Sequence, residues 1–440
     1  MKKECITGAI TFMFIMTFAA VSFGAGFQIP EQGAASIGMG MGGIGKADDL
    51  SAIYQNPAGL VQLKGTRLYG NLAGISPKAT YTRTDFDSVE SKSDLIPVPG
   101  FVISSDFGGR LENVVLAFGM NSQFGLRNEY DAFGPQRYIT TNISLTTIFV
   151  GPYAAWQVHP TFSIGGGVQY VYASAEIRQK INYGGALYQM VARQNPAMAD
   201  PSWNENPAFD GELSIKNATD HKFAGNLGLM WKPLEALQVG LTWRSEVECD
   251  IEGDVTLNIP SMLTQASGGF MQSLTTTGKT TLSLPQIVGV GLSYRPTEQC
   301  TLITDINWNN WSIYKNINFE FQENTPYFPD SENLRNWEDT WTFRLGGEYM
   351  LQERIALRAG YLFDQSPIPE KSLGPELPTG DRHGITLGAG YKWGNVVLDV
   401  AYSHLFVKDR TVTESIRIPV PSGVYESSAN IFAASVGFVF

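Results

Sequence analysis

The sequence predicts an all-β fold, a transmembrane antiparallel β-barrel of about fourteen strands that is plugged by a small N-terminal hatch. Three observations lead to this prediction. The chain starts with a secretory signal, and its later segments alternate between apolar and polar residues. In addition, no continuous apolar stretch after residue 24 is long enough for a membrane-spanning helix.

Residues 1–24 have the organisation of a signal peptide. The basic residues Lys2 and Lys3 precede an apolar core at 9–23, and small residues stand just before Ala25. The alternative, an N-terminal membrane helix, would need a longer apolar run. We therefore expect an exported mature chain that begins near Ala25.

The composition narrows the class of protein. The net charge is −11, which speaks against a nucleic-acid partner, because such proteins need a basic surface. Hydrophobic residues make up 43% and aromatic residues 12% of the chain, which leaves a large soluble all-β protein or an outer-membrane barrel. Cys249 and Cys300 follow the signal peptide; a disulfide between them is open, but two cysteines do not make a disulfide scaffold.

Alternation with a period of two identifies the strands. In one example, Val288, Val290, Leu292 and Tyr294 fall on one face, and mostly small residues fall on the other. The same pattern recurs in the segments 238–244, 355–364 and 385–392.

Five hairpins repeat one arrangement, in which an aromatic residue precedes a short polar turn. They lie at 151–170, 225–243, 289–308, 345–363 and 387–405, and their aromatic residues are Trp156, Trp231, Tyr294, Tyr349 and Tyr391. Aromatic side chains at one common level form a girdle at a membrane–water interface.

The connections at the other rim are long and polar. They lie at roughly 182–211, 258–279, 322–338, 366–382 and 409–427. Short turns at one rim and long loops at the other predict an outer-membrane protein of a Gram-negative bacterium, surrounded by outer-membrane lipid. An even number of strands closes the sheet with both termini on the periplasmic side. We expect a monomer.

The last strand, 430–440, is apolar on one face and ends the chain on Phe440. A terminal aromatic residue on such a strand is common in outer-membrane proteins. It predicts the barrel assembly machinery as a partner.

The stretch 36–59 contains Gly38, Gly40 and Gly43 at the spacing of a dinucleotide-binding fingerprint. A Rossmann site needs a preceding buried strand and a following helix, and the sequence predicts neither. We expect instead that residues 25–63 form a hatch inside the barrel of residues 64–440, where small residues allow close backbone packing.

Residues 25–60, which include Asn56, Pro57 and Ala58, resemble the N-terminal hatch of the FadL family of outer-membrane long-chain fatty-acid and hydrocarbon transporters. Further similar segments follow at 171–177, 243–253, 281–286, 363–371 and 381–391, so the resemblance covers essentially all of residues 25–440. It implies passive uptake of long-chain fatty acids or similar hydrophobic compounds.

The resemblance also implies a route. The substrate is captured in an apolar groove among the extracellular loops, binds inside the barrel and leaves sideways through a gap in the wall. An inward kink in the third strand, residues 121–130, makes this gap. Phe124 and Gly125 mark the kink, and it is expected to touch the hatch triplet of Asn56, Pro57 and Ala58.

Two loops carry apolar residues at helical spacing and are expected to form the groove. These residues are Leu187, Met190 and Val191 in one loop, and Met262, Leu263 and Phe270 in the other. Exposed apolar patches with flexible methionine suit a hydrophobic ligand. The alternative is that the two loops simply pack on each other.

The sequence departs from the family at the ligand head group. Two basic residues near the ligand head group in the best-known fatty-acid member of the family correspond to Gln179 and Glu338 here. The candidate replacements that would bind a carboxylate are Arg178, Lys180, Arg244 and Arg358. Strand alternation turns the first two away from Gln179. Uptake of a neutral monoaromatic hydrocarbon therefore stays open, as does a structural or adhesive barrel without transport.

The sequence offers no catalytic, metal or cofactor site. It has no G-x-S-x-G segment, and its histidines, His159, His221, His383 and His404, stand in no catalytic or metal-binding pattern. We expect a protein that is not an enzyme and needs no cofactor.

Overall fold

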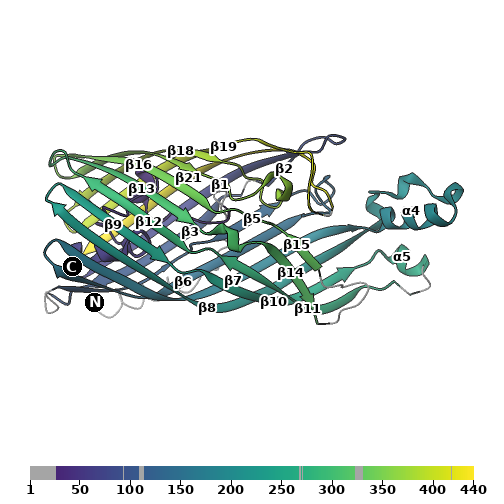
Figure 1. Ribbon diagram of the computed structural model, residues 1–440, viewed down its shortest axis with the longest axis horizontal. Helices are drawn as coiled ribbons and strands as arrows, with labels where there is room; N and C mark the ends of the chain where they lie inside the picture. The colour runs from purple at the N-terminus through teal and green to yellow at the C-terminus, as the bar shows by residue number, and fades with distance from the viewer. Residues whose placement is uncertain are drawn as a thin grey trace, which may run out of the picture.

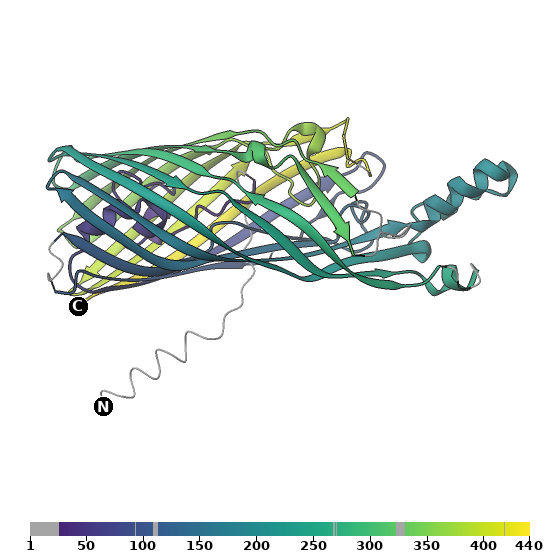
Figure 2. The same cartoon turned by 60° about the horizontal axis from the view of Figure 1, so that its bottom comes forward.

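The computed structural model describes residues 26–92, 94–108, 113–266, 269, 271–322, 331–417 and 419–440. The predicted signal peptide, residues 1–24, lies outside these ranges. The described chain forms a closed antiparallel β-barrel of fourteen strands, which confirms the predicted fold class. The C-terminus lies at the rim with the short turns, and long arms extend from the opposite rim (Figures 1 and 2).

The wall is built from strands that follow one another around the barrel. In chain order they are β1 (Arg67–Thr82), β2 (Val89–Glu90), β3 (Ile96–Ser105), β4 (Val114–Asn121), β5 (Gly125–Glu129), β6 (Asn142–His159), β7 (Phe162–Asn182), β8 (Asp210–Leu234), β9 (Leu237–Arg244), β10 (Val247–Asn258), β11 (Leu274–Leu284), β12 (Ile287–Tyr294), β13 (Cys300–Asn309), β14 (Asn316–Phe321), β15 (Ser331–Leu334), β16 (Thr340–Leu351), β17 (Ile355–Asp364), β18 (Arg382–Trp393), β19 (Val396–Val407), β20 (Arg410–Val412) and β21 (Gly423–Val439).

Several passes through the wall consist of two labelled strands separated by a short break, such as β4 with β5 and β9 with β10. The first and last strands close the barrel, because β1 and β21 pair in register from Arg67↔Val439 to Thr82↔Val424. Closure leaves no unpaired sheet edge in contact with lipid.

Helical segments are short and lie in the hatch and the loops. They are α2 (Ala34–Gly38), α3 (Ala52–Gln55), η1 (Pro57–Gln62), α4 (Tyr183–Gln194), η2 (Pro196–Met198), η3 (Pro201–Trp203), η4 (Pro207–Phe209), α5 (Ser261–Ala266), η5 (Trp311–Ile313) and η6 (Glu370–Ser372). In the described ranges, none of the helices is both long and apolar enough to cross a membrane.

The predicted aromatic girdle faces outward. The five aromatic side chains that precede the short turns are each between 45% and 52% exposed: Trp156, Trp231, Tyr294, Tyr349 and Tyr391. Large apolar side chains such as Leu227, Leu345 and Leu387 are also exposed further along these strands. The outer surface is therefore the apolar face that a bilayer requires.

The N-terminal residues lie inside the barrel near the short turns (Figure 1, purple). Backbone and wall approach each other closely there. A Cβ atom on Gly228 would lie 2.0 Å from Asn56 Oδ1, and one on Gly240 would lie 2.2 Å from the carbonyl oxygen of Ile44. Wall glycines thus allow the hatch to pack directly against the strands.

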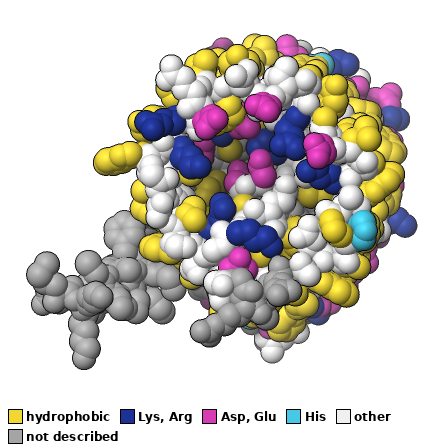
Figure 3. All heavy atoms as spheres, turned by 90° about the vertical axis from the view of Figure 1, so that its left-hand side faces the viewer, with side chains coloured by type: hydrophobic (Ala, Val, Ile, Leu, Met, Phe, Trp, Pro, Cys, Tyr) yellow, Lys and Arg dark blue, Asp and Glu magenta, His cyan; other side chains and the backbone are white. Residues whose placement is uncertain are grey.

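Polar contacts also hold the hatch to the wall. The Asp305 carboxylate accepts hydrogen bonds from the backbone N–H groups of Gly43 and Ile44, at 2.6 and 3.1 Å. Lys46 lies 3.3 Å from Glu348, which also pairs with Arg358. Figure 3 looks onto this end and shows basic and acidic side chains gathered around its centre. The glycines in this segment therefore serve packing within a barrel, and no nucleotide site forms around them.

We predict that Gly228→Val displaces the hatch, because its side chain would overlap Asn56. Ion conductance through the purified protein in planar bilayers should then rise several-fold over that of the unaltered protein. Gly70→Val is the matched control, because a Cβ atom on Gly70 meets nothing within 4 Å. A folded Gly228→Val barrel with unaltered conductance would contradict this account of the hatch.

Candidate functional site

Above the hatch, the buried lining of the lumen is mainly apolar. One continuous cluster of buried apolar side chains joins residues from the wall and the loops: Phe124, Leu126, Leu145, Phe149, Val171, Ile215, Ile251, Val255, Leu257, Leu263, Trp311, Trp337, Leu373 and Leu377. An interior of this kind stabilises a ligand by removing its apolar surface from water.

A cavity of about 200 Å³ opens within this half of the barrel. One side of it is apolar and is formed by Ile143, Ile177, Leu213, Ile215, Ile317, Phe319 and Phe321. The other side carries Arg335, Glu376 and Arg417, and Gln179 lines the cavity as well. The cavity therefore combines an apolar wall with a cluster of charged groups.

The charged cluster contains two arginines and one carboxylate. Arg417 Nη1 lies 2.7 Å and Arg335 Nη2 lies 3.5 Å from Glu376 Oε1. Burial opposes ionisation of Glu376, but the charges of Arg417 and Arg335 hold its pKa below the usual value. Burial, together with the charge of Arg417, lowers the pKa of Arg335. The cluster thus has one more positive charge than negative charges, which suits an anionic group at the end of an apolar ligand.

The third pass of the wall is interrupted beside this apolar interior. Strand β4 ends at Asn121 and β5 begins at Gly125. Strand β3 pairs with β4 only from Ser105↔Leu116 to Phe101↔Met120. In the described ladder, residues 96–100 of β3 therefore pair with β1 on one side and with no strand on the other. The break is held by Thr147, whose hydroxyl accepts from the N–H of Phe124 at 3.1 Å and donates to the carbonyl of Phe124 at 2.6 Å.

The N-terminal arm of the hatch pairs with this interruption. The N–H of Gly125 donates to the carbonyl of Phe27 at 2.8 Å, and the N–H of Ile29 donates to the carbonyl of Gln123 at 2.8 Å. An isolated bridge joins Gln28 and Phe124. The arm thereby replaces the neighbouring strand that this segment lacks.

An aromatic cluster covers the same point from the lumen. The ring of Phe27 lies 4.9 Å from Trp311, 5.6 Å from Tyr314 and 6.2 Å from Phe124, as measured between ring centroids. Trp337 packs on Trp311 and on Tyr314. These rings belong to the apolar interior, which therefore packs directly against the break in the wall.

The hatch triplet occupies a different place from the one expected. The Asn56 amide donates to the carbonyl of Leu229 on β8 at 3.0 Å, and Ser163 on β7 donates to the carbonyl of Ala58 at 3.0 Å. A Cβ atom on Gly165 of β7 would lie 2.5 Å from the backbone of Pro57. The expectation that the triplet touches the kink is corrected: the kink is hydrogen-bonded to residues 27–29 and to Gln32, because the arm reaches that side of the barrel first.

The two predicted loop segments form α4 and α5 at the tips of the long arms (Figure 1). On α4, Met190 is exposed, and Leu187 and Val191 are half-buried. On α5, Met262 is exposed, whereas Leu263 is buried in the apolar cluster. Phe270 lies outside the described residues. The apolar groove between these loops stays a prediction.

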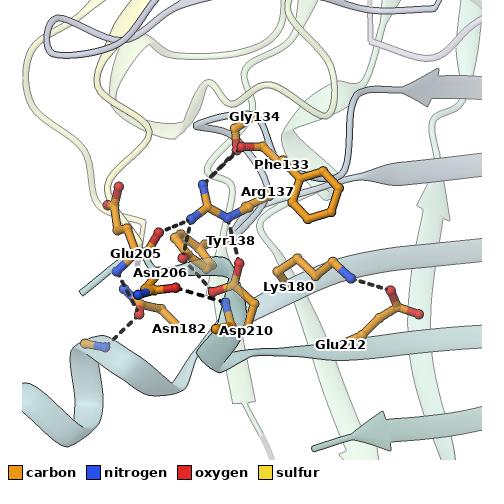
Figure 4. A network of polar contacts seen from close by, with 12 residues as sticks. Phe133, Gly134, Arg137, Tyr138, Lys180, Asn182, Glu205, Asn206, Asp210 and Glu212 are labelled. Atoms are coloured by element: carbon orange, nitrogen blue, oxygen red, sulfur yellow. Dashed lines mark hydrogen bonds and ion pairs between the residues drawn. The ribbon is translucent and has the colours of Figure 1, made fainter. Parts of the chain in front are cut away.

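Polar contacts fix the base of α4 (Figure 4). Arg137 donates to Asp210 at 2.8 Å and to the carbonyl of Glu205 at 2.6 Å, and Tyr138 donates to Asp210 at 2.7 Å. The Asn182 side chain caps α4 by accepting from the N–H of Gly185 at 2.7 Å. The arm therefore holds its helix in a defined orientation at its tip.

The four candidate head-group residues lie away from the cavity. Arg178 pairs with Glu176 and Lys180 with Glu212, both on the strand face opposite to Gln179. Arg244 stacks 3.8 Å above the ring of Tyr54 in the hatch, and Arg358 is held by Glu348 and Asp399. We therefore do not propose that these four residues bind the ligand head group.

Sequence reasoning missed Arg335, Glu376 and Arg417. All three stand in the long connections, where no periodic pattern indicates direction, and more than 80 residues separate the first from the last. The position that corresponds to a basic residue in the family, Gln179, does line the cavity. Gln179 was thus the one residue singled out from the sequence that pointed to this cavity.

Comparison with known proteins agrees with this architecture. The model of the family described as outer membrane protein transport protein (OMPP1/FadL/TodX) matches residues 15–440. The long-chain fatty acid transport protein of Salmonella typhi is 24% identical over 92% of this chain and 93% of its own length. The protein of the same name from Escherichia coli strain K12 is also 24% identical over the same shares of the two chains.

Solved structures show the same fold. A FadL homologue from Pseudomonas aeruginosa superposes with a TM-score of 0.78 at 19% identity, covering 94% of this chain and 100% of its own. The toluene transporter TodX of P. putida superposes with a TM-score of 0.70 at 16% identity, covering 95% and 99% of the two chains.

We predict that Phe27→Ala loosens the break in the third pass. Removal of a buried phenylalanine ring costs about 3 kcal/mol, which corresponds to about a hundredfold faster amide hydrogen exchange if the loss is local. The change should appear at Gly125, whose N–H donates to Phe27. Phe432→Ala removes an exposed ring on the outer wall and should leave this exchange unaltered. Equal exchange at Gly125 in the two variants would show that the arm does not hold the break.

Proposed function

The chain belongs to the outer membrane protein transport protein family (OMPP1/FadL/TodX), and on that premise we propose that it takes up long-chain fatty acids or similar hydrophobic compounds. It lies in the outer membrane of a Gram-negative bacterium. The proposed process is passive: capture by the apolar loop segments, binding in the lumen and sideways exit into the bilayer. We propose no catalytic role, in keeping with the transport functions in its relatives' names.

The amphipathic cavity is the observation that carries this proposal. An apolar wall faces two arginines that share one carboxylate, so both ends of a long-chain carboxylic acid find a matching environment. The chain of the acid would be removed from water, and its carboxylate would receive charge-assisted hydrogen bonds. This arrangement favours a fatty acid over a neutral hydrocarbon.

The cavity and the break in the third pass are physically connected. Asn128 on β5, three residues after Gly125, donates to the carbonyl of Pro375 at 2.9 Å. Pro375 precedes Glu376 of the charged cluster. On the other side, the N–H of Arg335 donates to the carbonyl of Lys315, next to the aromatic cluster at Tyr314. A ligand that leaves the cavity would therefore meet Phe27 and Phe124 at the break.

Sideways exit agrees with the chemistry of the ligand. A long acyl chain that crossed an open periplasmic pore would have to expose its apolar surface to water. The hatch fills the periplasmic end of the barrel, whereas the break lies in the wall itself, between β3 and β5. Two apolar grooves of about 620 and 790 Å³ lie on the outer wall toward the short turns, lined by exposed residues such as Leu116 and Leu229, where they would contact lipid.

We predict that Arg417→Gln weakens the binding of oleate about tenfold, because a hydrogen bond to a charged group contributes about 1.5 kcal/mol or more. The measurement is displacement of a fluorescent long-chain fatty acid from purified protein. Binding of methyl oleate should be nearly unaltered. The control is Arg178→Gln, because Arg178 lies on the face of β7 opposite to Gln179 and does not line the cavity. Equal effects on the acid and the ester would mean that the site reads only apolar shape, and neutral hydrocarbons such as toluene would become the preferred ligands.

We predict that sideways exit fails when the break is altered. The variant Gly125→Val places a branched side chain where the backbone meets Phe27. It should slow the uptake of radiolabelled oleate by cells while the barrel still assembles in the outer membrane. Normal uptake by this variant would rule out exit through this break.

A further inference from the structure

The wall contains a second interruption, between β8 and its neighbour. Strand β8 pairs with β9 up to Asn226↔Arg244, and it pairs with β10 from Thr219↔Glu252 onward. Between these two pairs, the backbone hydrogen bond described is the one from the N–H of Ser245 to the carbonyl of Gly225, at 2.9 Å. Residues 220–224 and 246–251 therefore run side by side without a described ladder.

Charged side chains fill this interruption. Asp220 Oδ2 accepts a hydrogen bond from the backbone N–H of Asp250 at 2.7 Å, where a neighbouring strand would normally supply a carbonyl. Lys222 Nζ lies 3.1 Å from Asp250 Oδ2 and 3.4 Å from Asp220 Oδ2. Lys279 of β11 lies 3.8 Å from Asp250 on its other side.

The Lys222–Asp250 pair crosses the wall. Lys222 is paired with Val171, a fully buried member of the apolar lumen cluster, and directly paired residues point to the same face of a sheet. Asp250 lies between Cys249 and Ile251, which both belong to that lumen cluster, so its side chain points outward. A contact of 3.1 Å between an inward and an outward residue requires the lysine chain to pass between the two strands.

The interruption lies at the border of the apolar outer band. On the lipid side it is flanked by Phe223 and Tyr170, which are exposed and paired with each other, and by Trp243. Within it and just beyond it, the outward residues of β10 are acidic, at Glu248 and Glu252 respectively. Because β8 runs from the long arm toward the short turns, this border is the outer one, at the level of the lipid head groups of the outer leaflet (Figure 1).

The closure of this opening is weak compared with a paired wall. Backbone groups that face lipid must find partners, and here side chains supply them. An ion pair that is partly exposed contributes only about 0–1 kcal/mol. Lys222 and Asp250 are each about one-third exposed. Separation of these side chains would open the wall without breaking a continuous ladder of backbone hydrogen bonds.

We propose that this interruption is a second lateral opening, through which single-chain anionic amphiphiles dissolved in the outer leaflet enter the lumen. The acyl chain would pass between Phe223 and Trp243 into the apolar cluster, and the anionic head group would displace Asp250 from Lys222 and Lys279. The inference rests on the proposed function, since it gives the same lumen a second source of ligand. It is distinct from the break in the third pass, which lies in another part of the wall.

A reversible bridge across the opening tests the proposal. In a background of Cys249→Ala and Cys300→Ala, the pair Lys222→Cys and Asp250→Cys would be joined by a short bis-methanethiosulfonate reagent. The control pair is Ser214→Cys with Thr256→Cys, which joins the same two strands where they are already paired. Cells would receive radiolabelled oleate either preloaded into the outer leaflet by donor vesicles or dissolved on albumin.

The bridge at 222 and 250 should slow uptake of the preloaded oleate several-fold, and a reducing agent should restore it. The control bridge should have no effect, and uptake from albumin should be affected less, because that oleate can enter through the loops. Equal uptake of preloaded oleate with either bridge would overturn the second opening while leaving the proposed function intact. An unbridged background that takes up no oleate from either source would overturn the proposed function and this inference with it.

Discussion

In a lipid environment, every backbone N–H and carbonyl group needs a partner within the protein, and the rest of this structure depends on that requirement. It explains why the wall closes between β1 and β21. It also explains how each interruption of the wall is handled. At residues 122–124 the N-terminal arm and Thr147 supply the missing partners. At the second interruption the Asp220 carboxylate accepts from the N–H of Asp250, and the Ser245 hydroxyl accepts from the N–H of Gly225. An interruption of a barrel wall is therefore a built feature that has its own set of contacts.

The hatch and the lumen divide the interior into two chemical zones. Around the hatch, glycines such as Gly228 and Gly240 allow direct backbone contact, and buried polar groups such as Asp305 accept hydrogen bonds from the hatch backbone. Above it the lining is apolar and ends at the arginine pair of Arg335 and Arg417. Water-filled passage is thus blocked where the interior is polar, while the apolar half adjoins the break in the wall. This arrangement suits a ligand that moves from loops to bilayer without entering the periplasm.

The sequence predicted the barrel well because the wall obeys a strict two-residue period, as residues 287–294 and the outward Tyr294 illustrate. It predicted a hatch at residues 25–63, because small residues and a missing strand pattern mark this segment. It did not indicate the charged cluster of the cavity, since Arg335, Glu376 and Arg417 come from three separate loops that only the closed barrel brings together. It also misplaced the contact of the kink. Pairing of Phe27 with Gly125 depends on the path of the arm through the lumen, which no local pattern encodes.

The most direct test of this account is the position of a bound ligand. A crystal of the protein with a long-chain fatty acid brominated at its terminal carbon would give anomalous density at the bromine and ordinary density along the chain. The account predicts a carboxylate beside Arg335 and Arg417, with the chain directed along the apolar lining toward Phe124 and the break between β4 and β5. Bromine density found solely on the lipid-facing wall, with an empty cavity, would contradict it.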